Sequence, residues 1–197
     1  MAALSHLVVR RPKLKRRNFL KSAASAFPLA LTQPFALATE SSDTPLKDAH
    51  MVPSGQDIFG ESRSLGFSRI SFKTSPQETA GNLFLIEHTN LVSGGPPLHL
   101  HHAQEEWFYI MEGEVLFQVG EKRLQLNPGD SVLAPRKVPH GFTGTGTKPA
   151  RMLIAFTPAG KMEQFFTDIA HGKVDLMDAA LFSKYDMQLI GPPIKAT

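Results

Sequence analysis

Short apolar runs separated by turn-forming residues fill the middle of this chain, from Leu83 to Phe156. The runs are Leu83–Ile86, Trp107–Met111, Val115–Val119, Leu124–Leu126, Ser131–Ala134 and Met152–Phe156. Glycine, proline, asparagine and aspartate stand between them, as in Asn127-Pro128-Gly129-Asp130, and these residues favour chain reversal. Short strands at a spacing of about ten residues are typical of a β-sandwich or barrel, and no helix of useful length fits among them.

The pattern changes after Pro158. Four apolar residues recur at three- and four-residue steps between Lys161 and His171, which predicts an amphipathic helix that ends at Gly172. Residues 174–184 predict a second, weaker helix, and both helices are expected to cap the barrel or cover its outer face. The tail from Leu189 to Pro193 cannot continue a helix. We therefore expect a helical extension over residues 161–197, after a barrel over residues 54–160.

Histidines and a glutamate form the densest chemical pattern. His99 and His101 are two residues apart, so on a strand both rings point to the same face. Glu106 follows a short polar turn, and His140 follows another turn that begins at Pro135. Three imidazoles and one carboxylate make a ligand set suited to iron, manganese, nickel, copper or zinc. Taken one at a time, these side chains could equally be solvated surface groups.

The spacing of these residues resembles the first of two motifs of the cupin family. That motif has a glycine, then His-X-His, then a glutamate, and six residues later another glycine. His99, His101, Glu106 and Gly113 keep those intervals, whereas Gly94-Gly95 lies slightly closer to His99 than the motif requires.

The second cupin motif is also present. Gly129, Pro135 and His140 match it, but Lys137 stands where the family has glycine and Gly144 stands where it has asparagine. Neither departure removes a ligand. The lysine affects the turn before His140, because glycine supplies a backbone conformation that lysine tolerates poorly. The resemblance covers roughly residues 55–160 and implies an all-β fold, the cupin double-stranded β-helix or jelly-roll barrel, with short C-terminal helices.

Strand alternation assigns the neighbours of the carboxylate. Glu106 is a better ligand than Glu105, because only Glu106 leaves the six residues that the motif has before its glycine. Phe108 and Ile110 should then share its inward face, and Trp107 and Tyr109 should face outward. His102 is expected to be exposed, and His88 and His171 are expected to be structural or at the surface.

Within the cupins, the run from Gly94 to Gly113 looks like the small quercetin-dioxygenase-like group. This resemblance implies an oxygenase acting on a small enol or aromatic, flavonol-like substrate. His99, His101 and His140 would hold the metal, and Glu106 would be both ligand and general base. The substrate would lie against Phe108, Ile110 and Phe142. Two alternatives stay open: a non-catalytic cupin that binds a small ligand, and a metal-dependent sugar or keto-acid isomerase.

The N-terminus resembles a twin-arginine export signal. Arg16-Arg17 is followed by Asn18-Phe19-Leu20-Lys21, then by a weakly hydrophobic stretch to Ala38, where Ala36-Leu37-Ala38 is a candidate cleavage site. A membrane anchor is the alternative, but polar residues and prolines interrupt the stretch before about 20 apolar residues are reached. We therefore expect a signal peptide over residues 1–38, a polar linker over residues 39–53, and a bacterial periplasmic location without a stable membrane span.

Charge and cysteine content narrow the function classes. The chain has 21 basic and 18 acidic residues, but seven of the basic ones lie in residues 1–38, which have no Asp or Glu. The remaining 14 against 18 give a formal charge of −4, so no nucleic-acid footprint is left. The absence of cysteine removes thiolate ligands. Twin-arginine export carries folded proteins, so iron or manganese inserted before export is favoured over copper, nickel or zinc.

The predicted outer face also bears on assembly. Trp107 and Tyr109, together with the C-terminal helix, would leave more apolar surface on the barrel exterior than a monomer usually exposes. The sequence therefore predicts a homodimer that binds a small-molecule substrate.

Overall fold

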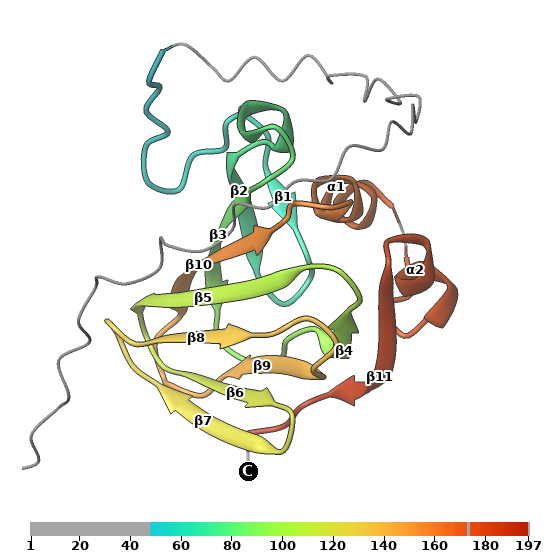
Figure 1. Cartoon of the computed structure of the whole chain (residues 1–197). Helices are drawn as coiled ribbons and strands as arrows, with labels where there is room; N and C mark the ends of the chain where they lie inside the picture. Colours follow the sequence, from blue (N-terminus) through green and yellow to red (C-terminus); the bar gives the residue numbers. More distant parts are fainter. Residues whose placement is uncertain (1–47, 173, 197) are drawn as a thin grey trace, which may run out of the picture. The chain divides into compact units, whose positions relative to one another are not determined.

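A computed structural model describes residues 48–172 and 174–196 of the chain. The predicted signal peptide and most of the predicted linker lie outside the described residues. Most of the regular secondary structure in the described part consists of antiparallel strands in two sheets (Figure 1), so the all-β prediction is confirmed. Among the described residues, no helix is long and apolar enough to cross a membrane.

The first sheet has six strands in the order β1-β2-β3-β10-β5-β8. Their bounds are Arg63–Ser64 for β1, Arg69–Thr74 for β2, Phe84–Leu91 for β3, Ala150–Thr157 for β10, Glu105–Glu112 for β5 and Ser131–Ala134 for β8. Every predicted apolar run in this region falls within a strand of one of the two sheets, apart from Leu83, which lies one residue before β3.

The second sheet has five strands in the order β11-β4-β9-β6-β7. Their bounds are Met187–Pro193 for β11, Pro97–His101 for β4, His140–Gly144 for β9, Val115–Val119 for β6 and Lys122–Leu126 for β7. Strands β4 and β9 are neighbours in this sheet, so the two histidine segments lie side by side.

The core lies between the two sheets. Along β5, Phe108 and Ile110 are buried and Trp107 and Tyr109 are only partly covered, as strand alternation predicts. The ring of Phe108 packs 4.8 Å from that of Phe117, which belongs to the other sheet. Aromatic contacts of this kind join the inward faces of the two sheets.

Two helices follow β10. The first is α1, Met162–His171, and its four apolar residues are buried, which confirms the predicted helix. The second, α2, is limited to Ala179–Lys184 because Asp178 caps its N-terminus through a hydrogen bond to the Ala180 N–H. A short 3₁₀ helix, Pro76–Thr79, precedes β3.

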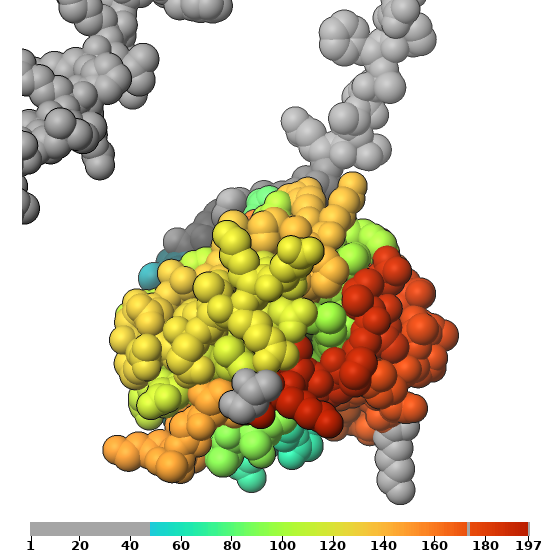
Figure 2. Space-filling view, turned by 90° about the horizontal axis from the view of Figure 1, so that it is seen from below, coloured from blue at the N-terminus to red at the C-terminus, as the bar shows by residue number. Residues whose placement is uncertain are grey.

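The C-terminal extension is not helical throughout, which corrects the expectation for residues 161–197. Strand β11 pairs with β4, and its Leu189 lies opposite His99 while Met187 lies opposite His101. Gly191-Pro192-Pro193 prevents a helix, but an edge strand tolerates proline because its outer N–H groups have no partner to lose. Figure 2 shows this red C-terminal segment beside the yellow surface of β7, where Arg123 donates a hydrogen bond to the Lys195 carbonyl.

Lys137 occupies the turn before β9 in a left-handed conformation, with φ of 65°. Its backbone N–H donates to the carbonyl of His101 over 2.7 Å, and this bond links the turn to the end of β4. A side chain at positive φ costs roughly 1–2 kcal/mol, which explains why glycine suits this position.

Replacing Lys137 by glycine should raise the free energy of unfolding by about 0.5–1 kcal/mol, because the strain removed exceeds the added entropy of the unfolded chain. Urea denaturation measures the change. Lys122→Gly, an exposed position within β7, is the control and should lower stability. Equal destabilisation by both substitutions would contradict the assigned strain.

Candidate metal centre

The predicted ligand residues converge on one point. His99 and His101 come from β4, Glu106 comes from β5, and His140 is the first residue of β9, directly opposite His99 in the sheet. One ligand atom from each of the four lies within 4.8 Å of the others, and all four side chains are buried. Two strands of one sheet and one strand of the other therefore deliver the cluster to the space between the sheets.

Backbone carbonyls orient two of the imidazoles. The Nδ1 of His99 lies 2.8 Å from the carbonyl oxygen of Pro97, and the Nδ1 of His140 lies 2.9 Å from that of Val138. When the Nδ1–H of His99 donates to its carbonyl, the Nε2 of that neutral ring is left free to face the cluster. His140 can donate both to Val138 and to Glu106 only when its ring is protonated. Hydrogen bonds of this type hold the rings of metal-binding histidines in proteins.

Glu106 is the centre of the hydrogen bonding. Its Oε2 accepts hydrogen bonds from His140 Nε2 at 2.8 Å and His101 Nε2 at 3.1 Å. Burial alone would raise the pKa of Glu106, but these two bonds hold it well below its usual range. The same contact raises the pKa of His140 against the opposing effect of burial. Burial and the neighbouring imidazoles lower the pKa of His99 to about 3, so this ring is neutral.

The donor set fits a divalent transition metal. Two ligands at about 2.1 Å from one ion are at most about 4.2 Å apart, so a spread of 4.8 Å closes around an ion with small side-chain shifts. Neutral imidazole and ionised carboxylate are the forms that bind metal. His101 Nδ1 is buried and has no hydrogen-bond partner among the described residues.

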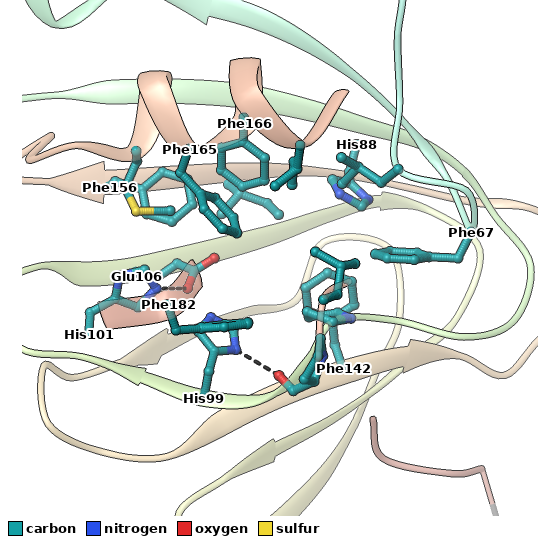
Figure 3. Close-up of a pocket in the computed structure, with 17 residues that line it drawn as sticks. Phe67, His88, His99, His101, Glu106, Phe142, Phe156, Phe165, Phe166 and Phe182 are labelled. Carbon is teal, nitrogen blue, oxygen red and sulfur yellow. Dashed lines mark hydrogen bonds and ion pairs between the residues drawn. The ribbon is translucent and has the colours of Figure 1, made fainter. Parts of the chain in front are cut away.

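A cavity opens above the cluster, between the sheets and the two helices (Figure 3). With its opening it contains about 500 Å³ of space free of atoms. Its polar lining consists of the cluster side chains His99, His101 and Glu106, together with His88. The rest of its side-chain lining is apolar: Leu65, Phe67, Pro96, Pro97, Phe142, Ile154, Phe156, Met162, Phe165, Phe166, Ile169, Leu176 and Phe182.

Of the three residues predicted to lie against the substrate, one lines this cavity. Phe142 lines the cavity, but Phe108 and Ile110 do not and are 1% and 0% exposed. Their side chains fill the closed end of the barrel, where Phe108 packs against Phe117 and Phe142. Alternation showed that they point inward, but it does not separate the packed end of a barrel from its open end.

Several cavity residues were missed or misassigned from sequence. The helices were expected to cap the barrel or cover its outer face, and they cap it; the sequence did not identify Phe165 and Phe166 of α1 or Phe182 of α2 as residues of the cavity wall. His88 was set aside as structural or surface, but it is buried in the wall on β3. Strand alternation with the buried Phe84 and Ile86 was the signal that could have placed it inward.

The remaining assignments agree with the structure. Glu105 points away from the cluster and forms an ion pair with Arg136 at 2.6 Å, so Glu106 is the inward carboxylate as predicted. His102 and His171 are exposed, as expected for surface histidines.

Comparison with known proteins finds similarity over the segment that carries this site. Residues 90–156 match the family described as the cupin domain, and this range contains all four cluster residues. A stretch of 61 residues is 33% identical to an uncharacterized protein of Methanocaldococcus jannaschii, covering 31% of this chain and 49% of the relative. The chain thus spans about half the length of the curated relative that it matches.

Solved structures of similar fold include an RmlC-like cupin from Shewanella frigidimarina, with 19% identity, a TM-score of 0.49, and coverage of 59% of this chain and 96% of that one. Another is TT1209 from Thermus thermophilus, with 29% identity, a TM-score of 0.38, and coverage of 40% and 74%.

Alanine at His99, His101 or His140 should each reduce bound divalent metal from near one per chain to a small fraction, because three remaining donors hold an ion weakly. His102→Ala is the matched control on the same segment and should retain the metal. Elemental analysis of folded protein, checked by circular dichroism, measures both. Full occupancy in any two of the three ligand variants would disprove the site.

Proposed function

We propose, from the cupin domain and the buried cluster within it, that the protein binds one divalent transition metal and acts as a dioxygenase on a small enol or aromatic substrate. The observation that carries the proposal is the pairing of a three-histidine, one-glutamate cluster with a cavity whose remaining walls are almost wholly apolar and largely aromatic. Such walls suit a flat, uncharged ring better than a sugar or a carboxylic acid.

The residues around the cavity would have separate roles in metal binding, proton transfer and substrate positioning. His99, His101 and His140 hold the ion, which when bound supplies the redox chemistry with dioxygen. Glu106 is ionised at neutral pH because His101 and His140 hydrogen-bond to it. As general base it would accept the hydroxyl proton of an enol whose acidity a bound cation raises. Phe156 and Phe182 orient the substrate against the cluster and exclude water from it.

The donor set and the predicted export route favour iron or manganese. Thiolates are absent because the chain has no cysteine, which disfavours copper(I) and structural zinc. Nitrogen and oxygen sites bind copper and zinc more tightly than iron or manganese, so metal insertion before twin-arginine export would let availability in the cytoplasm decide occupancy. A periplasmic protein that contains mainly copper or zinc would contradict this part of the proposal.

The two alternatives make different demands on the cavity. A sugar isomerase needs polar side chains for the substrate hydroxyls, and a keto-acid isomerase needs a cationic side chain for the carboxylate. Apart from the cluster and His88 the cavity lining is apolar, and no lysine or arginine lines it in the described part of the chain. A non-catalytic binding protein would bind an aromatic ligand without consuming oxygen. Substrate-dependent oxygen uptake by metal-loaded protein separates the dioxygenase from both.

Glu106→Gln should weaken metal binding and lower oxygen uptake by roughly 100-fold or more, because the amide loses both the anionic charge and the proton affinity. Glu105→Gln is the matched control, since that side chain points away and pairs with Arg136. It should retain metal and activity. Loss of activity in Glu105→Gln, with Glu106→Gln active, would reverse the assignment.

The predicted homodimer rests on the outer face of the six-stranded sheet. Trp107 and Tyr109 stack there at 6.0 Å, and Leu133 opposite Trp107 is 49% exposed. The apolar face of α1 no longer supports the dimer, because it is turned toward the cavity. We propose that the sheet face alone pairs two copies, and a monomer in light scattering at micromolar concentration would exclude this.

A further inference from the structure

His88 is a buried histidine in the cavity wall that the metal cluster does not use. It lies on β3, between Ile70 of β2 and Met152 of β10, and is 1% exposed. Its ring packs at right angles to Phe142 at 5.6 Å and is tilted against Phe67 at 6.1 Å. Figure 3 shows His88 and Phe67 at one end of the cavity and Glu106 and His101 at the other.

The polar capacity of this ring is not used within the described residues. Its Nδ1 is buried and has no hydrogen-bond partner among them. Burial lowers the pKa of His88 to about 4, so the ring is neutral at physiological pH. A neutral imidazole offers one N–H donor and one acceptor nitrogen. Buried polar atoms without partners are uncommon and disfavour the folded state unless something else supplies a bond.

The cavity therefore has two polar ends and an apolar middle. The cluster forms one end and His88 forms the other, while phenylalanines, isoleucines and leucines make up most of the space between them. No lysine or arginine lines the cavity in the described ranges, so a charged group away from the metal would be buried without a counter-ion.

We propose that His88 is a specificity-determining residue that hydrogen-bonds the distal hydroxyl or carbonyl group of an uncharged, apolar-bodied substrate. The inference rests on the proposed function, since the other end of that substrate is the group that binds the metal. It adds the substrate class: a molecule with two oxygen functions at opposite ends of an aromatic or aliphatic body.

A purely structural role for His88 predicts a different result when the residue is substituted. If the ring served only to fill space beside Phe67 and Phe142, phenylalanine would replace it without changing which ligands bind. If the ring hydrogen-bonds the substrate, phenylalanine should preserve the core packing and the metal content. It should remove the difference in affinity between ligands with and without a distal hydroxyl.

Phenylalkyl hydroxamic acids are suitable probes, because the hydroxamate binds many divalent metals and the body can be lengthened stepwise. Each length is prepared unsubstituted, with a para-hydroxyl and with a para-carboxylate. Calorimetry with the manganese-loaded protein should show, at the best-fitting length, roughly tenfold tighter binding of the hydroxyl member than of the unsubstituted one. The carboxylate member should bind at least about tenfold more weakly than the unsubstituted one, since no cation offsets its charge.

In His88→Phe, the two uncharged members should bind equally, with metal content unchanged. His88→Asn, which keeps a polar atom near the position of Nδ1, should retain part of the preference. Equal binding of the uncharged members by the wild type, a preference that survives in His88→Phe, or failure of every probe to bind would overturn the inference. Metal content and oxygen uptake test the proposed function separately, so the proposed function and the inference about His88 can fail independently of each other.

Discussion

The buried carboxylate of Glu106 is the interaction on which the rest of this structure depends. A carboxylate that is 4% exposed, beside phenylalanine side chains, must be compensated by hydrogen bonds and a nearby positive charge. His101 and His140 supply the hydrogen bonds, and His140 gains proton affinity from the contact. A divalent cation bound by the three imidazoles would supply the positive charge that this buried anion needs.

The fold holds this cluster through backbone contacts more than through side chains. Carbonyls of Pro97 and Val138 fix two of the rings, and the Lys137 N–H ties the turn before β9 to the end of β4. Strand β11 covers the edge of β4, and the helices close the cavity above the cluster. The segment after β10 thus contributes Phe165, Phe166 and Phe182 to the cavity wall, and β11 pairs with the strand that carries His99 and His101.

The fold and the cluster could be predicted from the sequence because short strands follow from the local pattern and because the spacing of the ligands resembles the two cupin motifs. His99 and His101 share a face on any strand, and the six-residue interval to Gly113 selects Glu106 over Glu105. The cavity could not be predicted to the same degree, because it depends on where a helix docks. The periodicity of α1 identified its buried face but not the surface that it covers. Strand alternation showed that the side chain of Phe108 points into the barrel, but not whether it lies at the cavity or in the packed core. β11 was missed because a proline-rich tail lacks a strand pattern, and only the unpaired edge of β4 explains it.

Metal-edge X-ray absorption on the natively purified protein tests the central claim most directly, namely that these four side chains share one ion. The account predicts a first shell of three imidazole nitrogens and a carboxylate oxygen at about 2.0–2.2 Å, and a metal-edge signal that falls to a small fraction of the wild-type signal in His140→Ala. A shell of oxygen ligands alone, or a wild-type spectrum unchanged in His140→Ala, would contradict it.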